Sequence, residues 1–301
     1  MKHISLYSLL LLLLFSCSKY ETQFEGPYSE EDNDVITEFN EFLIIQSNKI
    51  KLIDRVKKEL KLVPTDESVS KAAFNYSRDK IAYQGSGNIK IIDIYGNFIA
   101  EIPGSQEAKY FEWHANNETL YYLLSNDIIM YYGPEIQIAN THLSNIFPPN
   151  TAAREVTSVG ICPDGTVIAG IRYKINGNYT RAINIDYPES SGLTDYSESD
   201  FDSYFIDQIK IDTAGQFFSF TTKSSNGNDY YGYTGEIGGS INSVNIYDIL
   251  LIAISPSGKR FAYIEEGYEY NFHIKDMLYV FSGNFEYQAT IEGATAMALD
   301  W

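Results

Sequence analysis

The sequence has few of the residues that form metal centres or disulfide frameworks. It contains two cysteines, Cys17 and Cys162, and four histidines in 301 residues. No His-x-His or His-x-x-x-His spacing occurs, and metal ligands usually arrive as closely spaced pairs on one element. We therefore expect no metal site built on histidine and no cofactor.

Positive charge and nucleophile motifs are scarce as well. Lys and Arg total 22 against 40 Asp and Glu, which gives a formal net charge of −18 at pH 7. Such a surface repels nucleic acid and anionic headgroups at long range, so no nucleic-acid partner is expected. A Gly-x-Ser-x-Gly elbow is absent, and Cys162 ends an apolar run, which favours a buried, inert thiol over a nucleophile. The sequence therefore does not predict an enzyme.

Only the N-terminus carries a long apolar run. The apolar stretch from Ile4 to Phe15 follows a short basic head, and its length is typical of a signal-peptide core rather than of a spanning helix of about 20 residues. The run ends Leu14-Phe15-Ser16-Cys17, which resembles the lipobox of bacterial lipoproteins. This resemblance implies cleavage before Cys17 and acylation of its thiol, with palmitate among the acyl chains. Loss of residues 1–16 removes Lys2 and takes the net charge from −18 to −19.

The chain after the leader divides into a tether and one domain. Residues 17–35 are polar and acidic, as expected of a linker, and residues 36–301 form the predicted domain. Ser18 stands where lipoproteins retained in the inner membrane carry Asp, so we expect the outer membrane. The sequence allows attachment to either the periplasmic or the cell-surface face of that membrane.

What the domain has in abundance is aromatic residues and a repeated phrase. The sequence holds 25 Tyr and 17 Phe, residues that favour strands. A short apolar strand, a polar turn and a second apolar strand recur. The equivalent second-strand positions are Ile81, Leu120, Val167, Phe217 and Phe261, at intervals of 39, 47, 50 and 44 residues. A period of about 40–50 residues with several strands per unit is typical of propeller blades.

The phrase resembles the WD40-like repeat of TolB-type propellers. In that family a Ser-Pro-Asp-Gly turn precedes the second strand; here Pro163-Asp164-Gly165 and Ser255-Pro256-Ser257-Gly258 are the nearest copies. The stretch Ile89 to Asn97 resembles the third strand and its Asp-Gly-Asn turn, with Tyr95 where Asp is usual. The resemblance covers about residues 36–301 and, with the composition, suits a Bacteroidetes-type bacterium.

Counting the repeated units, with one more before Ile81, gives six blades, and the first lacks its opening strand. Strands are expected near Glu41–Gln46, Lys49–Asp54 and 59–63, which makes three. The segment 297–301 supplies a spare strand. We therefore predict an all-β, six-bladed β-propeller that is closed by the C-terminal strand pairing into the first blade.

Two groups of residues are candidates for contact with a partner. An acidic stretch holds Asp195, Glu198, Asp200 and Asp202, and is interpreted as a contact loop, a weak calcium site or a solvated loop. Three tyrosines expected outside regular strands, Tyr230, Tyr268 and Tyr270, suggest an aromatic platform, with packing between blades as the alternative. The segments Tyr132–Glu155 and Pro188–Tyr204 are expected to be irregular.

Three functions follow from these features. The first is a non-catalytic lipoprotein that binds a protein partner, or acts as a scaffold, in an envelope complex. The second is a glycan-binding accessory lipoprotein, which rests on the tyrosines. The third is a lactonase or lyase of the propeller type, for which the sequence offers no constellation of catalytic residues.

Asp212-Thr213-Ala214 also resembles an O-glycosylation site of Bacteroidetes-type bacteria.

Overall fold

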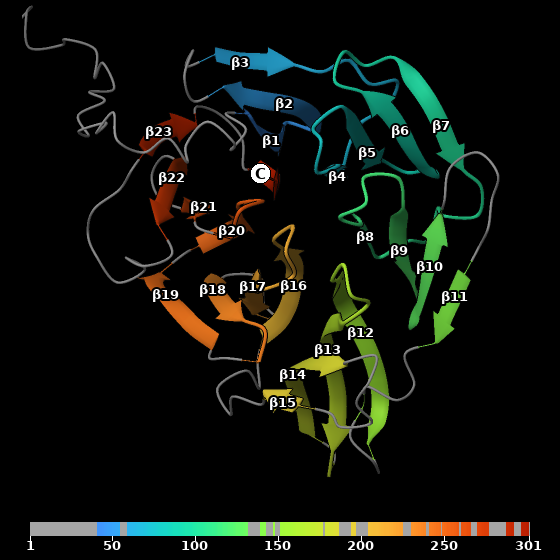
Figure 1. Cartoon of the computed structure of the whole chain (residues 1–301), viewed down its shortest axis with the longest axis vertical. Coiled ribbons are helices and arrows are strands. Elements are labelled where there is room, and N and C mark those ends of the chain that lie inside the picture. Colours follow the sequence, from blue (N-terminus) through green and yellow to red (C-terminus); the bar gives the residue numbers. More distant parts are fainter. Residues whose placement is uncertain are drawn as a thin grey trace, which may run out of the picture.

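The computed structural model shows an all-β protein (Figure 1). It describes residues 41–54, 59–131, 139–142, 147, 151–176, 178–186, 194–196, 204–224, 230–238, 241–247, 249–258, 260–265, 270–276, 287–291 and 296–300. Those residues form 24 strands and contain no helix.

The strands form six antiparallel sheets of four strands each. Listed from one edge of each sheet to the other, they are β24 (Ala296–Asp300), β1 (Glu41–Gln46), β2 (Lys49–Asp54) and β3 (Glu59–Leu62); β4 (Lys71–Phe74), β5 (Lys80–Gln84), β6 (Ile89–Asp93) and β7 (Phe98–Ile102); β8 (Tyr110–Trp113), β9 (Leu120–Leu124), β10 (Asp127–Tyr131) and β11 (Ala139–His142); β12 (Ala152–Ile161), β13 (Val167–Ile175), β14 (Asn178–Asp186) and β15 (Thr194–Tyr196); β16 (Tyr204–Ile211), β17 (Phe217–Ser224), β18 (Tyr230–Glu236) and β19 (Ile241–Tyr247); β20 (Ile249–Ile254), β21 (Arg260–Glu265), β22 (Tyr270–Asp276) and β23 (Tyr287–Ile291). We number these sheets 1 to 6 in that order.

Sheet 1 joins the two ends of the domain. The C-terminal strand β24 pairs with β1, with Leu43 opposite Asp300 and Ile45 opposite Ala298. The predicted spare strand therefore lies beside the first strand of the domain. Without β24, the edge of β1 would be left without a partner.

The strands of each sheet lie one beside the next from the centre of the molecule to its periphery (Figure 1). The strands β24, β4, β8, β12, β16 and β20 contact one another in this order, and β20 also contacts β24. The strands β3, β7, β11, β15, β19 and β23 lie at the periphery.

The repeated phrase of the sequence forms a similar turn in sheets 2 to 6. In each, the N–H of the first turn residue donates to a carbonyl four or five residues later, at or just before the start of the next strand. These bonds are Asn75 to Lys80 (3.1 Å), His114 to Thr119 (2.9 Å), Cys162 to Thr166 (2.8 Å), Asp212 to Phe217 (3.1 Å) and Ser255 to Arg260 (2.9 Å). The carbonyl of that first residue accepts from a residue with a φ between 61° and 90°, which is Arg78, Asn117, Gly165, Gly215 or Gly258. Gly suits this left-handed position because it has no Cβ.

The hydrophobic core lies between neighbouring sheets. Apolar side chains of sheets 1 and 2, Leu43 and Phe74 among them, form one buried cluster, and similar clusters join sheets 2 and 3, 3 and 4, and 4 and 5. Trp113 is fully buried between sheets 3 and 2, and its indole N–H donates to the carbonyl of Ala73 at 3.2 Å. Because adjacent strand residues face opposite sides, each middle sheet buries both of its faces.

Candidate functional site

At the centre of the molecule, polar side chains join sheets 3 and 5. We call Tyr110, Glu112 and Lys210 the central cluster. Lys210 on β16 forms an ion pair with Glu112 on β8, and their exposed fractions are only 8 % and 5 %. The hydroxyl of Tyr110 donates to the carbonyl of Ile209 at 2.6 Å. Sheet 4 lies between sheets 3 and 5 in chain order, so these bonds skip a sheet.

An irregularity in β16 places its half of this cluster. The register with β17 shifts between Asp207 and Lys210, and Gln208 has a positive φ of 52°. The backbone N–H of Gln208 donates to the carboxylate of Asp207 at 2.9 Å. A bulge of this kind bends its strand and redirects the side chains that follow. It therefore accounts for the contact of Ile209 and Lys210 with β8.

The buried carboxylate of Glu112 has further partners. Its Oε1 accepts the backbone N–H of Trp113 at 3.0 Å, and the Tyr110 hydroxyl lies 3.4 Å from Oε2. Burial, followed by the charge of Glu112, raises the pKa of Tyr121 well above its ordinary value, so this phenol stays neutral. Removal of either partner of a buried ion pair destabilises a protein because it leaves the other charge buried and uncompensated.

A small pocket opens beside the central cluster. It has a volume of about 330 Å³, which includes open solvent, and its walls come from sheets 2, 3, 5 and 6. The lining residues are Phe74, Asn75, Tyr76, Glu112, Lys210, Ile211, Ile254 and Pro256. The Tyr76 hydroxyl donates to the carbonyl of Ile211 at 2.9 Å, which ties sheet 2 to sheet 5. The polar groups of this pocket thus connect sheets to one another.

Cys162 lies in the turn of sheet 4 and is buried, as the sequence predicts. Burial, assisted by the charges of Asp164 and Asp212, raises the pKa of its thiol to about 12. Because the thiolate is the nucleophilic form, this thiol is unreactive at neutral pH. The backbone of Gly215 packs so closely on Cys162 that a Cβ there would lie 3.0 Å from the cysteine Cβ.

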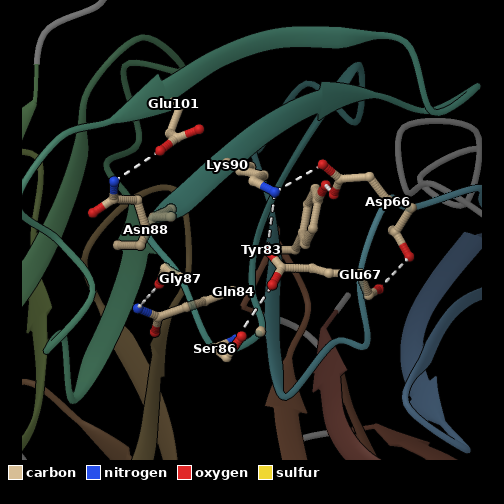
Figure 2. A network of polar contacts seen from close by, with 12 residues as sticks. Asp66, Glu67, Tyr83, Gln84, Ser86, Gly87, Asn88, Lys90 and Glu101 are labelled. Carbon is tan, nitrogen blue, oxygen red and sulfur yellow. Dashed lines mark hydrogen bonds and ion pairs between the residues drawn. The ribbon is translucent and has the colours of Figure 1, made fainter.

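A polar network fastens the segment that follows β3 to sheet 2 (Figure 2). Lys90 on β6 lies 2.8 Å from Asp66 Oδ2 and 3.1 Å from Glu67 Oε1, both in the segment that follows β3. The Tyr83 hydroxyl donates to Asp66 at 2.6 Å, and the N–H of Ser86 donates to Glu67 at 3.3 Å. The hydrogen bond from Lys90 lowers the pKa of Asp66, and the same contact raises the pKa of Lys90. Both groups therefore remain charged at neutral pH.

Beside this network, four large apolar side chains are exposed. Tyr95 is 66 % exposed, Phe98 64 %, Leu62 52 % and Ile99 48 %, and among the described residues these four are the exposed large apolar ones. Lys61 joins them, since its Nζ lies 4.8 Å from the centre of the Tyr95 ring. We call these five residues the rim patch. They come from β3, the β6–β7 turn and β7, at the outer edges of sheets 1 and 2 (Figure 1).

The residues that the sequence singled out lie mostly beyond what the structure describes. Cys17, Glu198, Asp200, Asp202 and Tyr268 fall outside the described residues. Asp195, Tyr230 and Tyr270 are placed by their backbone alone, and no described contact joins these three to one another.

Their backbone positions correct two sequence-based expectations. Asp195 belongs to β15 and lies opposite Asn184 of β14, so the segment expected to be irregular contains the fourth strand of its sheet. Tyr230 and Tyr270 begin β18 and β22 rather than lying outside strands. A three-residue edge strand needs only backbone pairing, so it lacks the apolar pattern that marks the longer strands.

The segment expected to be irregular before residue 155 contains strands as well. It holds β11, and β12 begins at Ala152.

Thr213, in the turn of sheet 5, donates its hydroxyl to the carbonyl of Pro256 at 2.6 Å. In the described part of the chain, no group of three or more His, Cys, Asp or Glu residues lies together as a metal site would require. Within that same part, no helix has the length and apolarity of a membrane span.

Sequence reasoning missed both the central cluster and the rim patch. Glu112 and Lys210 are 98 residues apart, and nothing in either local sequence indicates the other. The rim patch did leave a signal, because Tyr95 stands where the repeat usually carries Asp. Exposed turns usually carry small or polar residues, so the aromatic side chain of Tyr95 marks this turn as unusual.

No protein-family model and no curated protein matches the sequence. The structure is similar to a chain in the crystal structure of a nidogen/laminin complex, at 10 % identity and a TM-score of 0.58, over 86 % of this chain and 97 % of that chain. It is similar to the β-propeller domain of Cps50 (Swd1) from Myceliophteria thermophila, at 12 % identity and a TM-score of 0.54, over 87 % and 86 % of the two chains. A putative TolB from Agrobacterium tumefaciens gives 11 % identity and a TM-score of 0.53, over 83 % and 89 %. These similarities show a β-propeller type of fold.

Proposed function

We propose that this protein is a non-catalytic lipoprotein of the outer membrane, which binds a protein partner as a scaffold component of an envelope complex. Its domain would be a six-bladed β-propeller in which each of the six sheets is one blade and β24 closes the first. A propeller presents broad surfaces on a rigid frame without any chemistry of its own.

The arrangement of the sheets supports the six-bladed propeller. The innermost strands contact one another in chain order, and β24 contacts both β20 and β4. The pairing of β24 with β1 supports closure. Three solved chains with TM-scores above 0.5, one of them described as a β-propeller domain, support a propeller type of fold without bearing on the number of blades.

The observation that carries the binding role is the central cluster. In lactonases and lyases of this architecture, the central funnel would have to offer reactive groups to a substrate. Here the carboxylate and the ammonium at the centre neutralise each other in a buried ion pair, and Tyr76 and Tyr110 are bonded to backbone carbonyls. This favours a structural role for the centre and a binding role for the outer surface.

The lipid anchor rests on Leu14-Phe15-Ser16-Cys17. The variant Cys17→Ala should remain unprocessed or become soluble, and should lose the palmitate label, whereas Ser18→Ala should behave like the wild type. Fractionation of membranes with metabolic labelling measures this. A cleaved Cys17→Ala protein that still partitions with membranes would refute the anchor.

The binding role is tested by isolating the full-length protein from its own membranes in mild detergent at low salt. A companion protein should co-purify in a fixed ratio and dissociate as salt rises. Neutralising Asp195, Glu198, Asp200 and Asp202 together tests the acidic stretch as a contact. A protein that comes out alone, or that retains a glycan or hydrolyses a lactone, would contradict the proposal.

A further inference from the structure

We infer that the rim patch is the docking site for the partner protein, and that the partner offers an apolar pocket edged by Lys or Arg. This inference rests on the proposed binding function and says where the contact lies. Large apolar side chains that gather on an otherwise polar surface mark interaction sites. Aromatic residues are also enriched at the centres of interfaces.

Lys61 and Tyr95 of the rim patch meet although they come from different sheets, whereas Leu62 faces the opposite side of sheet 1 from Lys61. The Nζ atom of Lys61, from sheet 1, lies over the ring of Tyr95, from sheet 2, at 4.8 Å from its centre. Gly96 lies so close to Pro64 that a Cβ on it would approach the Pro64 carbonyl oxygen to 2.7 Å. The turn of sheet 2 therefore packs directly on the segment that follows β3.

The turn that carries Tyr95 is also held in place before any partner binds. Asp93 Oδ1 accepts the N–H groups of Tyr95 (2.9 Å) and Asn97 (2.8 Å), and Asp93 Oδ2 accepts the Asn97 side-chain amide at 2.7 Å. Lys90 fastens β6 to Asp66 and Glu67 of the neighbouring segment. A preorganised surface loses little conformational freedom on binding, which favours affinity.

The backbone of β7 argues against a partner that adds a strand to this edge. In the register with β6, Ile92 lies opposite Phe98 and Ile91 opposite Ala100, so Ile99 is the extra residue of a bulge. Bulges on outer strands bend the edge and block pairing with another chain. The partner therefore recognises side chains, with Tyr95 and Phe98 as the projecting anchors.

Charge selects among the remaining occupants. A second copy of this chain carries the same net charge of −18, and an anionic lipid surface is also negative, so both are repelled. Asp93 and Glu101 bracket Phe98 and Ile99 along the chain. The hydrogen bond from Asn97 lowers the pKa of Asp93, so it is ionised at neutral pH. The two carboxylates of Asp93 and Glu101 outnumber the one ammonium group of Lys61 in the rim patch, so complementarity favours basic residues around the apolar pocket of the partner.

The test uses the full-length lipidated protein in its own membranes. A photo-crosslinking amino acid replaces Phe98 in one strain and Glu107, an exposed residue before β8, in the other. Position 98 should cross-link to one protein, at a peptide that lines an apolar pocket with Lys or Arg nearby, and position 107 should not. Equal cross-linking from both positions, or a site without basic residues, would overturn the inference.

Substitutions then measure the contribution of each anchor. Tyr95→Ser and Phe98→Ser should each reduce the amount of co-purified partner about tenfold or more. Tyr95→Phe and Phe98→Leu should restore most of it, and Glu107→Ser should have no effect. Glu101→Lys should weaken the association at low salt and leave it nearly unchanged at high salt. Retention of the partner by both serine variants would refute the inference while leaving the binding function intact.

Other occupants are separate outcomes of the same series. The soluble Cys17→Ala form is mixed with phosphatidylethanolamine vesicles with and without phosphatidylglycerol, and it is also sedimented alone. Vesicle binding or dimerisation that Phe98→Ser abolishes would overturn the inference in favour of a membrane or a second copy. If the wild type co-purifies with no protein, the proposed function fails together with this inference.

Discussion

The centre and the rim of this protein place their side chains in opposite ways. At the centre, charged and hydroxyl groups are buried and bonded from one sheet to another, as in the pair of Glu112 and Lys210. At the rim, Tyr95 and Phe98 are exposed, while the salt bridges of Lys90 hold their surroundings in place. Buried polar groups need fixed partners, so they fix the geometry of the sheets. Exposed apolar groups are the ones that a partner could bury, so our proposal places the contact at the rim.

The largest expected effect comes from removing the strand that completes sheet 1. Deleting residues 294–301 removes β24, exposes the edge of β1 and takes away the contacts of β24 with β20 and β4. The truncated chain should aggregate or lose its cooperative thermal transition, because an open edge invites pairing between molecules. Light scattering and calorimetry measure this. An unchanged melting curve would show that β24 is dispensable.

The next effect concerns the central cluster. Lys210→Met leaves the carboxylate of Glu112 buried without its cation and should lower the free energy of unfolding by about 3–5 kcal/mol. Adding Glu112→Gln removes that charge as well and should recover a large part of the loss. Chemical denaturation of the three proteins measures both steps. If the free energy of unfolding of Lys210→Met lies within about 0.5 kcal/mol of the wild-type value, the structural role of this pair is contradicted.

A smaller effect of opposite sign is expected at Asp212. Its Oδ1 accepts the N–H groups of Gln216 (2.7 Å) and Phe217 (2.8 Å), and burial raises its pKa above the ordinary value of 3.8. The folded state therefore holds this proton more tightly than the unfolded state, and stability falls as pH rises from about 4 through the folded pKa. Asp212→Asn keeps the acceptor and removes the charge, so it should stabilise the protein at pH 7 by up to about 1 kcal/mol.

Sheet 2 supplies a matched control for that variant. Asn75 occupies the equivalent turn position and accepts the N–H groups of Asp79 (3.1 Å) and Lys80 (2.9 Å), while its own amide donates to the Asp79 carboxylate. Asn75→Asp would place a second carboxylate beside Asp79 and should destabilise the protein. Unfolding curves at pH 4 and pH 7 distinguish the two variants. A loss of stability at pH 7 on Asp212→Asn would contradict our interpretation.

The smallest effect on stability is expected at the rim. Phe98→Ser and Tyr95→Ser change exposed side chains and should alter the free energy of unfolding by no more than about 0.5 kcal/mol. The same variants should have the largest effect on partner binding. Thermal melts alongside co-purification measure the contrast. A large loss of stability would show that these side chains belong to the packing between sheets 1 and 2.

The sequence could predict the parts of the fold that repeat. The five turns were found because a polar turn separates two apolar strands in each unit, and Gly165, Gly215 and Gly258 supply the left-handed residue in three of them. The pairing of the last strand followed from counting strands in the first unit. The strands β11 and β15 were missed, since short outer strands carry little apolar pattern.

The candidate sites were harder to predict for a physical reason. The contact between Glu112 and Lys210 depends on the order of the sheets and on a bulge in β16, neither of which a local pattern encodes. Exposure at the rim depends on what packs against β7, so Phe98 looks like any strand residue in the sequence. In the sequence, only Tyr95 pointed to the rim patch, because it occupies a turn position where a polar residue is usual.

The contrast between centre and rim can be measured directly by hydrogen exchange on the protein alone and in complex with its co-purified partner. Our account predicts slow exchange at residues 209–212 in both samples, and new protection at residues 61–62 and 95–99 only in the complex. New protection at the centre with an unchanged rim would contradict it.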